Sequence, residues 1–223
     1  MQNVLLVVAK KPSPGRTKTR LCPPLNCEQA ADLYECFLCD TLAVMRDVPN
    51  VTPKIVYLPQ DAHDYFRNLA PDMDLVQQRG ESLGERLDNL LTDVLLDGAD
   101  KAVVMNSDSP TLPKAYLIQA FDQLSATDVV LGPTLDGGYY LIGVKEPQPG
   151  ILRDVEMSTP YVLRDTLELA RKAGVTVSLL PEWYDVDTVE ELHRLRNDIS
   201  GLQNNSCACT RAWLQNYPGN GDG

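Results

Sequence analysis

The feature that most constrains the fold of this chain is the alternation of short apolar runs with longer amphipathic segments. The run Asn3–Ala9 (NVLLVVA) is continuous and rich in β-branched residues, which is typical of a strand covered on both faces. The segment Cys27–Arg46 instead carries apolar residues at helical spacing behind Asn26, a good N-cap residue. This alternation predicts a mostly parallel sheet with helices on both faces, an α/β fold built as a three-layer α/β/α sandwich.

The same two patterns divide the rest of the sequence. The motifs Ser82-x-x-Glu85 and Thr188-x-x-Glu191 are capping boxes that open two later helices. Further strands are predicted at 54–58, 74–77, 101–105, 128–131, 139–144 and 175–180, and further helices at 61–69, 82–97, 114–124, 159–173 and 188–199. We therefore expect one domain over residues 1–199 and a partly disordered tail at 200–223, which ends in the disordered stretch PGNGDG.

Charge and apolar content exclude several classes of partner. The chain has 20 basic and 31 acidic residues, a net charge of −11, which argues against binding to nucleic acid or to anionic membranes. The apolar run near its start is too short for a membrane span or a signal peptide. With two histidines, a three-histidine metal site is excluded. We expect a cytoplasmic protein, and no pattern indicates its oligomeric state.

The cysteines are expected to be reduced thiols. The C-x-x-C pair Cys36 and Cys39 has the spacing of a redox motif, but it falls in the middle of a predicted helix, which favours two small packing residues. Cys207 and Cys209 lie in the polar tail. A zinc site that joins them to the pair at 22 and 27 is disfavoured, because the spacing matches no common zinc pattern.

A strongly basic segment follows the first predicted strand. Residues 10–20 (KKPSPGRTKTR) hold five of the 20 basic residues, and no acidic residue precedes Glu28. Prolines forbid a helix here, and ligands of open α/β sheets bind beyond the carboxyl ends of strands. We expect the loop to bind the phosphates of a nucleotide; the alternative is a solvated loop paired with the protein's own acids. The candidate phosphate-binding residues are Lys11, Gly15, Arg16, Lys18 and Arg20.

Acidic residues follow two later strands. Asp108 comes directly after the strand 101–105, and Asp185 and Asp187, two apart in an extended segment, follow the strand 175–180 and point the same way. Magnesium, or manganese in its place, prefers a few carboxylates together with substrate phosphates and water. These three residues are the candidate metal ligands opposite the basic loop. The alternative interpretation is that each is an ordinary turn residue.

A fourth segment carries paired glycines. In the stretch 134–140 (TLDGGYY), Gly137 and Gly138 permit a tight turn and leave room for a substrate beside Asp136. A role in substrate contact and a simple hairpin turn are equally good interpretations.

These segments resemble a known family. The motifs are PGRTKTRL (14–21), GESLGERL (80–87), NSDSPTLP (106–113), DGGYYLIG (136–143) and WYDVDT (183–188). Together they look like the DUF2064 family of the nucleotide-diphospho-sugar transferase superfamily, with a GT-A-like fold. Members are described as glycosyltransferase-like or radical-SAM/selenodomain-associated transferases, with remoter similarity to phospholactate or phosphoenolpyruvate guanylyltransferases and molybdenum-cofactor nucleotidyltransferases.

The resemblance also implies roles. It puts Arg16, Lys18 and Arg20 on the phosphate-binding loop, Asp108 on the metal-binding Asp after the central strand, and Asp185 with Asp187 on the second acidic pair. One departure is that the family's Gly-Asp-Leu-Gly reads Glu81-Ser82-Leu83-Gly84 in this chain. We interpret Ser82 first as a helix N-cap, so an acidic substrate contact there is in doubt.

Three functions fit these residues. The first is Mg²⁺-dependent nucleotidyl transfer from a nucleoside triphosphate to a small phosphorylated or carboxylated acceptor, with Lys18 and Asp108 as catalytic residues. The second is glycosyl transfer from an NDP-sugar, with Asp136 as the base that deprotonates an acceptor hydroxyl. The third is a nucleotide-binding module without turnover. Fold analogy alone does not separate the three.

Overall fold

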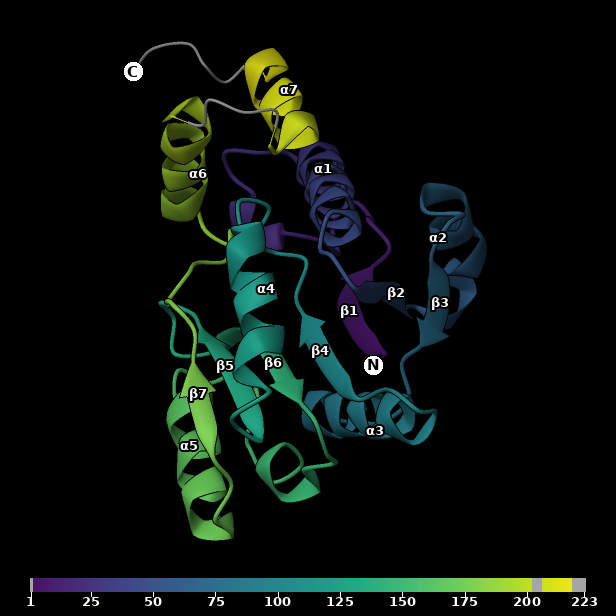
Figure 1. Cartoon of the computed structure of the whole chain (residues 1–223). Helices are drawn as coiled ribbons and strands as arrows, with labels where there is room; N and C mark the ends of the chain where they lie inside the picture. The colour runs from purple at the N-terminus through teal and green to yellow at the C-terminus, as the bar shows by residue number, and fades with distance from the viewer. Residues whose placement is uncertain (1, 202–205, 218–223) are drawn as a thin grey trace.

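A computed structural model describes residues 2–201 and 206–217 (Figure 1). Its centre is a seven-stranded sheet of order β3-β2-β1-β4-β6-β5-β7. The strands are β1 Asn3–Lys10, β2 Val51–Leu58, β3 Asp74–Gln77, β4 Lys101–Met105, β5 Val129–Pro133, β6 Tyr139–Val144 and β7 Val177–Leu179. The helices are α1 Cys27–Arg46, α2 His63–Leu69, α3 Leu83–Leu96, α4 Lys114–Gln123, α5 Val162–Ala173, α6 Val189–Gly201 and α7 Ala208–Asn216.

The predicted three-layer sandwich is confirmed by two apolar cores, one on each face of the sheet. Alternate residues of β1 point to opposite faces: Leu5 packs in the core under α1, α2, α4, α6 and α7, whereas Leu6 packs in the core under α3 and α5. Both side chains are fully buried. Burial on both faces is why this strand reads as a continuous apolar run in the sequence.

The direction of the strands determines which loops share an edge. β1, β2, β3 and β4 pair in parallel, and β5 pairs in parallel with β7, but β6 runs antiparallel to both β4 and β5. The loops that follow β1, β4 and β7 therefore lie at the same edge as the turn between β5 and β6. This is the edge at which the sequence places the basic loop, the acidic residues and the paired glycines.

The tail expected at 200–223 contains a helix that the sequence did not predict. This helix, α7, forms from residues 208–216 and packs along α1, next to α6 (Figure 1). Its sequence is short and mixed, so it gave no strong helical pattern. The disorder expected for PGNGDG concerns residues outside the described ranges. None of the helices in the described ranges combines the length and apolar character that a bilayer crossing requires.

Candidate active site

Lys18 joins the basic loop to both acidic segments. Its ammonium Nζ lies 2.5 Å from Asp108 Oδ1 and 2.8 Å from Asp187 Oδ1. The side chain is 4% exposed and lies against the rings of Tyr34 and Phe37 on α1. Its backbone has a φ of 49°, in the left-handed region that non-glycine residues rarely adopt. Three segments far apart in the sequence therefore meet at one buried ammonium group.

The two carboxylates keep this buried lysine charged. Burial alone would lower the pKa of Lys18, but the charges and hydrogen bonds of Asp108 and Asp187 outweigh it and raise the pKa well above its usual range. The two carboxylates are each about one-third exposed, at 34% and 35%. In this state Lys18 neutralises part of the negative charge of the aspartates. The alternative interpretation of the basic loop, in which it pairs with the protein's own acidic residues, therefore applies to Lys18.

Asp185 is held by side chains from the loop after β4. Asn106 Nδ2 donates to both of its carboxylate oxygens at 2.9 Å, and Ser109 Oγ donates to Oδ1 at 2.6 Å. Burial and the nearby charge of Asp108 raise the pKa of Asp185 to about 6. Sequence reasoning missed Asn106 and Ser109, although both belong to the NSDSPTLP motif.

The backbone fixes the position of the second acidic pair. Val186, between the two aspartates, is fully buried, and its N–H donates to the carbonyl of Asp108 at 2.9 Å. Glu191 Oε2 accepts the N–H groups of Asp187 and Thr188, each at 2.7 Å. The capping motif predicted at the start of α6 therefore also holds Asp187 in place.

A buried hydrogen bond between the hydroxyl groups of Tyr34 and Ser107 joins the loop after β4 to α1. Tyr34 and Ser107 share a hydrogen bond of 2.7 Å, and Ser107 Oγ also donates to the carbonyl of Val8 at 3.1 Å. Burial, with the charge of Asp108, raises the pKa of Tyr34 to about 12, so this phenol stays protonated at neutral pH. Sequence reasoning interpreted Tyr34 as a core residue of α1, and nothing in its helical spacing distinguishes it from the other core positions.

Two adjoining cavities share the carboxylates. One, of about 500 Å³, is lined by the basic loop and by Arg86 of α3. The other, of about 540 Å³, is lined by the β5–β6 turn, by the residues before α5 and by Asp185. Asp108, Asp187 and Arg20 line both. The acidic cluster therefore stands at the boundary between a basic cavity and a second, less basic one.

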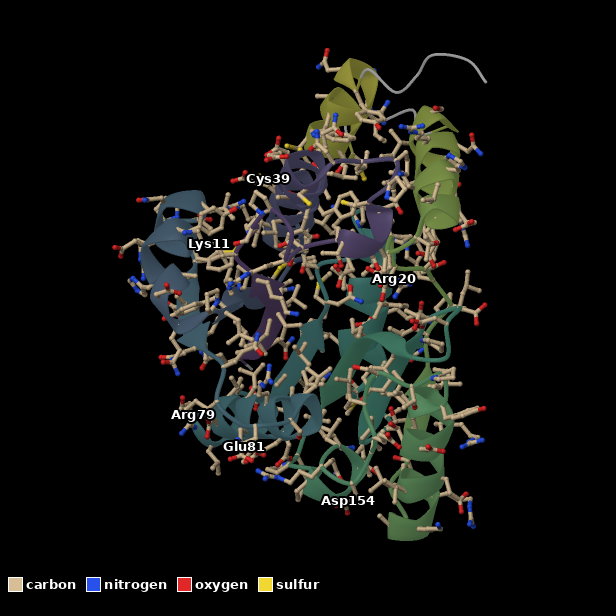
Figure 2. The ribbon with its side chains drawn as sticks, turned by 180° about the vertical axis from the view of Figure 1, so that it is seen from behind. Lys11, Arg20, Cys39, Arg79, Glu81 and Asp154 are labelled. Atoms are coloured by element: carbon tan, nitrogen blue, oxygen red, sulfur yellow. The ribbon has the colours of Figure 1, made fainter. Side chains whose placement is uncertain are left out.

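The basic side chains of the loop after β1 point in different directions. Arg16, Lys18 and Arg20 line the first cavity, and Arg20 is 66% exposed with NH1 3.9 Å from Asp187 Oδ2. Lys11 lines neither cavity. It lies on the α2 side of the molecule, with Nζ 5.8 Å from the ring centroid of Tyr65, whereas Arg20 lies on the side of α6 (Figure 2).

Two further residues at the basic loop differ in whether they line the first cavity. Lys10, which sequence reasoning did not select, lines the first cavity in place of Lys11, because successive strand residues point to opposite sides. Gly15 also lines neither cavity; its φ of 71° places it in the turn that begins the loop. Its role is therefore in shaping the turn.

The β5–β6 turn was interpreted either as a simple hairpin turn or as a substrate contact, and its structure is compatible with both. Asp136 Oδ1 accepts hydrogen bonds from Thr134 Oγ1 at 2.6 Å and from the N–H of Gly138 at 3.1 Å, which makes it a turn residue. Asp136 and Gly138 also line the second cavity. Gly137 does not line it, but its φ is 90° and a Cβ there would come within 2.1 Å of the Pro160 carbonyl oxygen. Only glycine fits at this position.

The departure at residues 81–84 also has a structural explanation. Ser82 Oγ accepts the N–H of Glu85 at 3.0 Å, so Ser82 is the N-cap of α3, as expected. Glu81 lies away from Arg20, near Arg79, and lines neither cavity (Figure 2). In this chain the segment contributes Leu83 and Arg86 to the site and no carboxylate.

The acidic cluster fits a hard divalent cation. Asp108 and Asp187 already place one oxygen each within 2.8 Å of a single positive atom, and carboxylates are ligands that Mg²⁺ prefers. Burial, and after it the nearby charge of Asp108, raises the pKa of Asp185, so a positive charge beside it would favour its ionised form. Within the described ranges no three His, Cys, Asp or Glu side chains form a ready-made metal site, so Lys18 would have to give up its place between the carboxylates.

Comparisons with known proteins show which sequences and structures this chain resembles. The chain is 28% identical to a 2-phospho-L-lactate guanylyltransferase from Methanothermobacter thermautotrophicus, over 78% of this chain and 76% of that protein. It superposes with a TM-score of 0.90 and 32% identity on a "putative nucleotide-diphospho-sugar transferase" from Desulfovibrio desulfuricans G20, over 96% of this chain and 94% of the other. A Mycobacterium tuberculosis protein, Rv0371c, solved as a manganese complex, shares the fold at 20% identity and a TM-score of 0.52, over 87% of this chain and 97% of that one.

A family model covers the central part of the chain. The model described as "Uncharacterized protein conserved in bacteria (DUF2064)" matches residues 41–159, which include three of the five motifs and Asp108. The fold and the family expected from the motifs are thereby confirmed. The chain is a transferase with a nucleotide-diphospho-sugar transferase fold, and it belongs to the DUF2064 family.

Proposed function

We propose that the protein transfers a nucleotidyl group from a nucleoside triphosphate to a small acceptor that carries a phosphate or carboxylate. The observation that carries the proposal is the meeting of Lys18 with Asp108 and Asp187 at the boundary of two cavities. A basic cavity suits the triphosphate, and the second cavity suits the acceptor. The relative from Methanothermobacter is a guanylyltransferase, which supports the same reaction class.

The reaction needs no protein nucleophile. An anionic oxygen of the acceptor forms a bond to the α-phosphorus, the bond to the bridging oxygen breaks, and pyrophosphate leaves with that electron pair. Arg16 and Arg20 bind the phosphates of the first cavity, and Lys18 turns from the carboxylates to the triphosphate. Catalysis is then positioning and charge stabilisation.

Asp108 and Asp187, with Asp185 beside them, would hold Mg²⁺ or Mn²⁺ in this proposal, and the bound ion would supply charge neutralisation of the phosphate oxygens. The three aspartates are the residues of this chain that would act as ligands of the ion. Asn106 and Ser109 keep Asp185 oriented through their hydrogen bonds. Lys18 holds Asp108 and Asp187 in place, at the position that the cation would take.

Glycosyl transfer is the second candidate, favoured by the description of the Desulfovibrio protein and by Asp136 on the wall of the second cavity. It has less support, because the cationic side chains that line the first cavity suit a triphosphate better. Asp136 Oδ1 accepts two hydrogen bonds within its turn, so Oδ2 would be the oxygen that takes the proton. A base that must take a proton needs an oxygen free to approach the acceptor hydroxyl.

One experiment separates the candidates. The purified protein is incubated with each of the four nucleoside triphosphates, Mg²⁺ and a panel of phosphorylated and plain 2-hydroxy acids, and pyrophosphate release is measured; a parallel panel contains NDP-sugars. Pyrophosphate release that depends on an acceptor supports the proposal. Release of a nucleoside diphosphate from an NDP-sugar contradicts the proposal and indicates glycosyl transfer instead. Tight nucleotide binding without either product indicates a binding module.

A further inference from the structure

Three of the six cysteines gather where the C-terminal helix packs on α1. Cys36 and Cys39 are one helical turn apart on α1, and Cys209 is in the first turn of α7, about 170 residues later in the chain. All three are half-buried free thiols. Cys39 lies on the part of α1 next to α7 (Figure 2). The candidate active site uses none of them.

Asp40 sets the distance between the two helices. Its buried carboxylate accepts the N–H of Cys209 at 3.0 Å and the N–H of Thr210 at 2.8 Å, so it caps α7 from α1. Cys36 is four residues before Asp40 on the same face of α1. The hydrogen bonds to Asp40 therefore hold Cys209 beside the C-x-x-C pair.

The thiols open to solvent along a groove. A cavity of about 370 Å³ between α1 and α7 is lined by both Cys36 and Cys209, with Trp213 and Tyr217 stacked at its side. Burial and the proximity of Cys209 raise the pKa of Cys36, and the same two causes raise the pKa of Cys39 to about 11. Both α1 cysteines are therefore protonated thiols at neutral pH, and a small disulfide can reach the cluster through the groove.

We propose that Cys209 and the C-x-x-C pair of α1 form a thiol–disulfide exchange site, in which a disulfide from Cys209 to Cys36 or Cys39 ties α7 to α1. Cys36 and Cys39 are poorly placed to form a disulfide with each other, because the backbone of an α-helix holds their two sulfur atoms apart. Cys209 comes from another helix and faces both, so it can link to either.

The oxidant is a low-molecular-weight disulfide such as oxidised glutathione. The Cys209 thiolate attacks one sulfur of it, which forms a mixed disulfide and releases one reduced glutathione. Cys36 or Cys39 then loses its proton and attacks the Cys209 sulfur, which releases the second glutathione. Two protein thiols are oxidised to one disulfide, and one glutathione disulfide is reduced to two thiols.

The test treats the full-length protein with oxidised glutathione, alkylates the remaining thiols under denaturing conditions and maps the linked peptides by mass spectrometry. We expect two fewer alkylated cysteines than in the reduced protein, a link between the peptides of Cys209 and α1, and a rise of the unfolding midpoint of at least about 3 °C. Dithiothreitol reverses all three changes.

Matched variants locate the link. Cys209→Ser and the double variant Cys36→Ser/Cys39→Ser lose the link and the rise in midpoint, whereas Cys27→Ser, at the exposed start of α1, keeps both. Because each single variant at 36 or 39 leaves one partner, each retains a link. Three outcomes contradict the proposal: six alkylated thiols after oxidation, a link confined to Cys22 and Cys27, or a stable glutathione adduct at Cys209 with no internal disulfide.

Discussion

Lys18 Nζ lies 2.8 Å from Asp187 Oδ1, between residues 169 positions apart in the sequence. The same ammonium contacts Asp108, so one cation of the basic loop holds the two acidic segments together. In the proposed mechanism, a divalent cation would compete with the Lys18 ammonium for these carboxylate oxygens. A bound triphosphate would resolve that competition, because its phosphates would give Lys18 another anionic partner.

Lys18→Met is expected to separate the two roles of this lysine. Loss of the ammonium should lower turnover by roughly a hundredfold or more, the usual effect of removing one charge contact to a transition state. The same change should tighten Mg²⁺ binding to the protein without nucleotide, as measured by calorimetry, because Asp108 and Asp187 lose their competing cation. Lys172→Met, an exposed lysine on α5, is the control. Weaker Mg²⁺ binding in Lys18→Met would argue against competition.

Asp108→Asn and Asp187→Asn should each abolish detectable turnover. Each removes a charge from the carboxylate pair, while the amide keeps an oxygen near Lys18. We expect Mg²⁺ affinity to fall by at least about tenfold in each variant, as measured by the Mg²⁺ dependence of nucleotide binding. Circular dichroism checks that the fold is retained. Normal rates in both variants, with a verified substrate pair, would exclude the proposed metal site.

Asp185 should make the stability of the metal-free protein depend on pH. Its pKa is raised to about 6 in the fold, so the protonated form is favoured there. Its contribution to stability is fully present below about pH 4 and is lost as the pH rises through 6. In urea unfolding with a chelator, wild type should lose on the order of 2 kcal/mol relative to Asp185→Asn between these limits. Parallel pH profiles for the two proteins would contradict the raised pKa.

Gly137→Ala should destabilise the turn that shapes the second cavity. The φ of 90° is unfavourable for alanine, and the new Cβ would meet the Pro160 carbonyl oxygen at 2.1 Å. We expect a loss of about 2–4 kcal/mol in the free energy of unfolding. Gly150→Ala is the matched control, because a Cβ there meets nothing within 4 Å. Its unfolding midpoint should change little.

Asp40→Ala should loosen α7 from α1. Two backbone N–H groups lose the acceptor that now lies at 2.8–3.0 Å, which should cost about 2–4 kcal/mol of stability. Asp40→Asn keeps one acceptor oxygen and should cost less, and Asp32→Ala, exposed on the same helix, should cost little. Hydrogen exchange at α7 is the direct measurement. Unchanged protection of α7 in Asp40→Ala would show that packing alone holds this helix.

The central part of the fold could be predicted because each element carries its own periodic signal. β4 and β6 have the predicted bounds, and the capping residues Asn26 and Ser82 mark the starts of α1 and α3. Two strands differ in their bounds: β7, at one edge of the sheet, is shorter than predicted, and β2, an inner strand, begins earlier, at Val51. The first residues of β2 and all of β7 are only partly buried or exposed, so their apolar pattern is weak.

The candidate site was predictable in its charges and less so in its contacts. The basic loop and the three aspartates stand out by type and position, and the structure brings Lys18 to Asp108 and Asp187. No local pattern could show that Lys11 turns toward Tyr65 or that Asn106 holds Asp185. These depend on which side of a strand a residue faces and on partners brought close only by the fold.

The reversed direction of β6 brings a short hairpin to the edge of the sheet at which the acidic segments lie. The turn before it, 134–138, is a short hairpin at the rim, whereas the loops after β1 and β4 connect to long helices packed in the core. The hairpin is also tied to the second acidic segment, because the N–H of Leu135 donates to the carbonyl of Trp183 at 3.2 Å and the N–H of Trp183 donates to the carbonyl of Pro133 at 3.0 Å. A substitution that reshapes the second cavity at this turn therefore also acts on the backbone that carries Asp185 and Asp187.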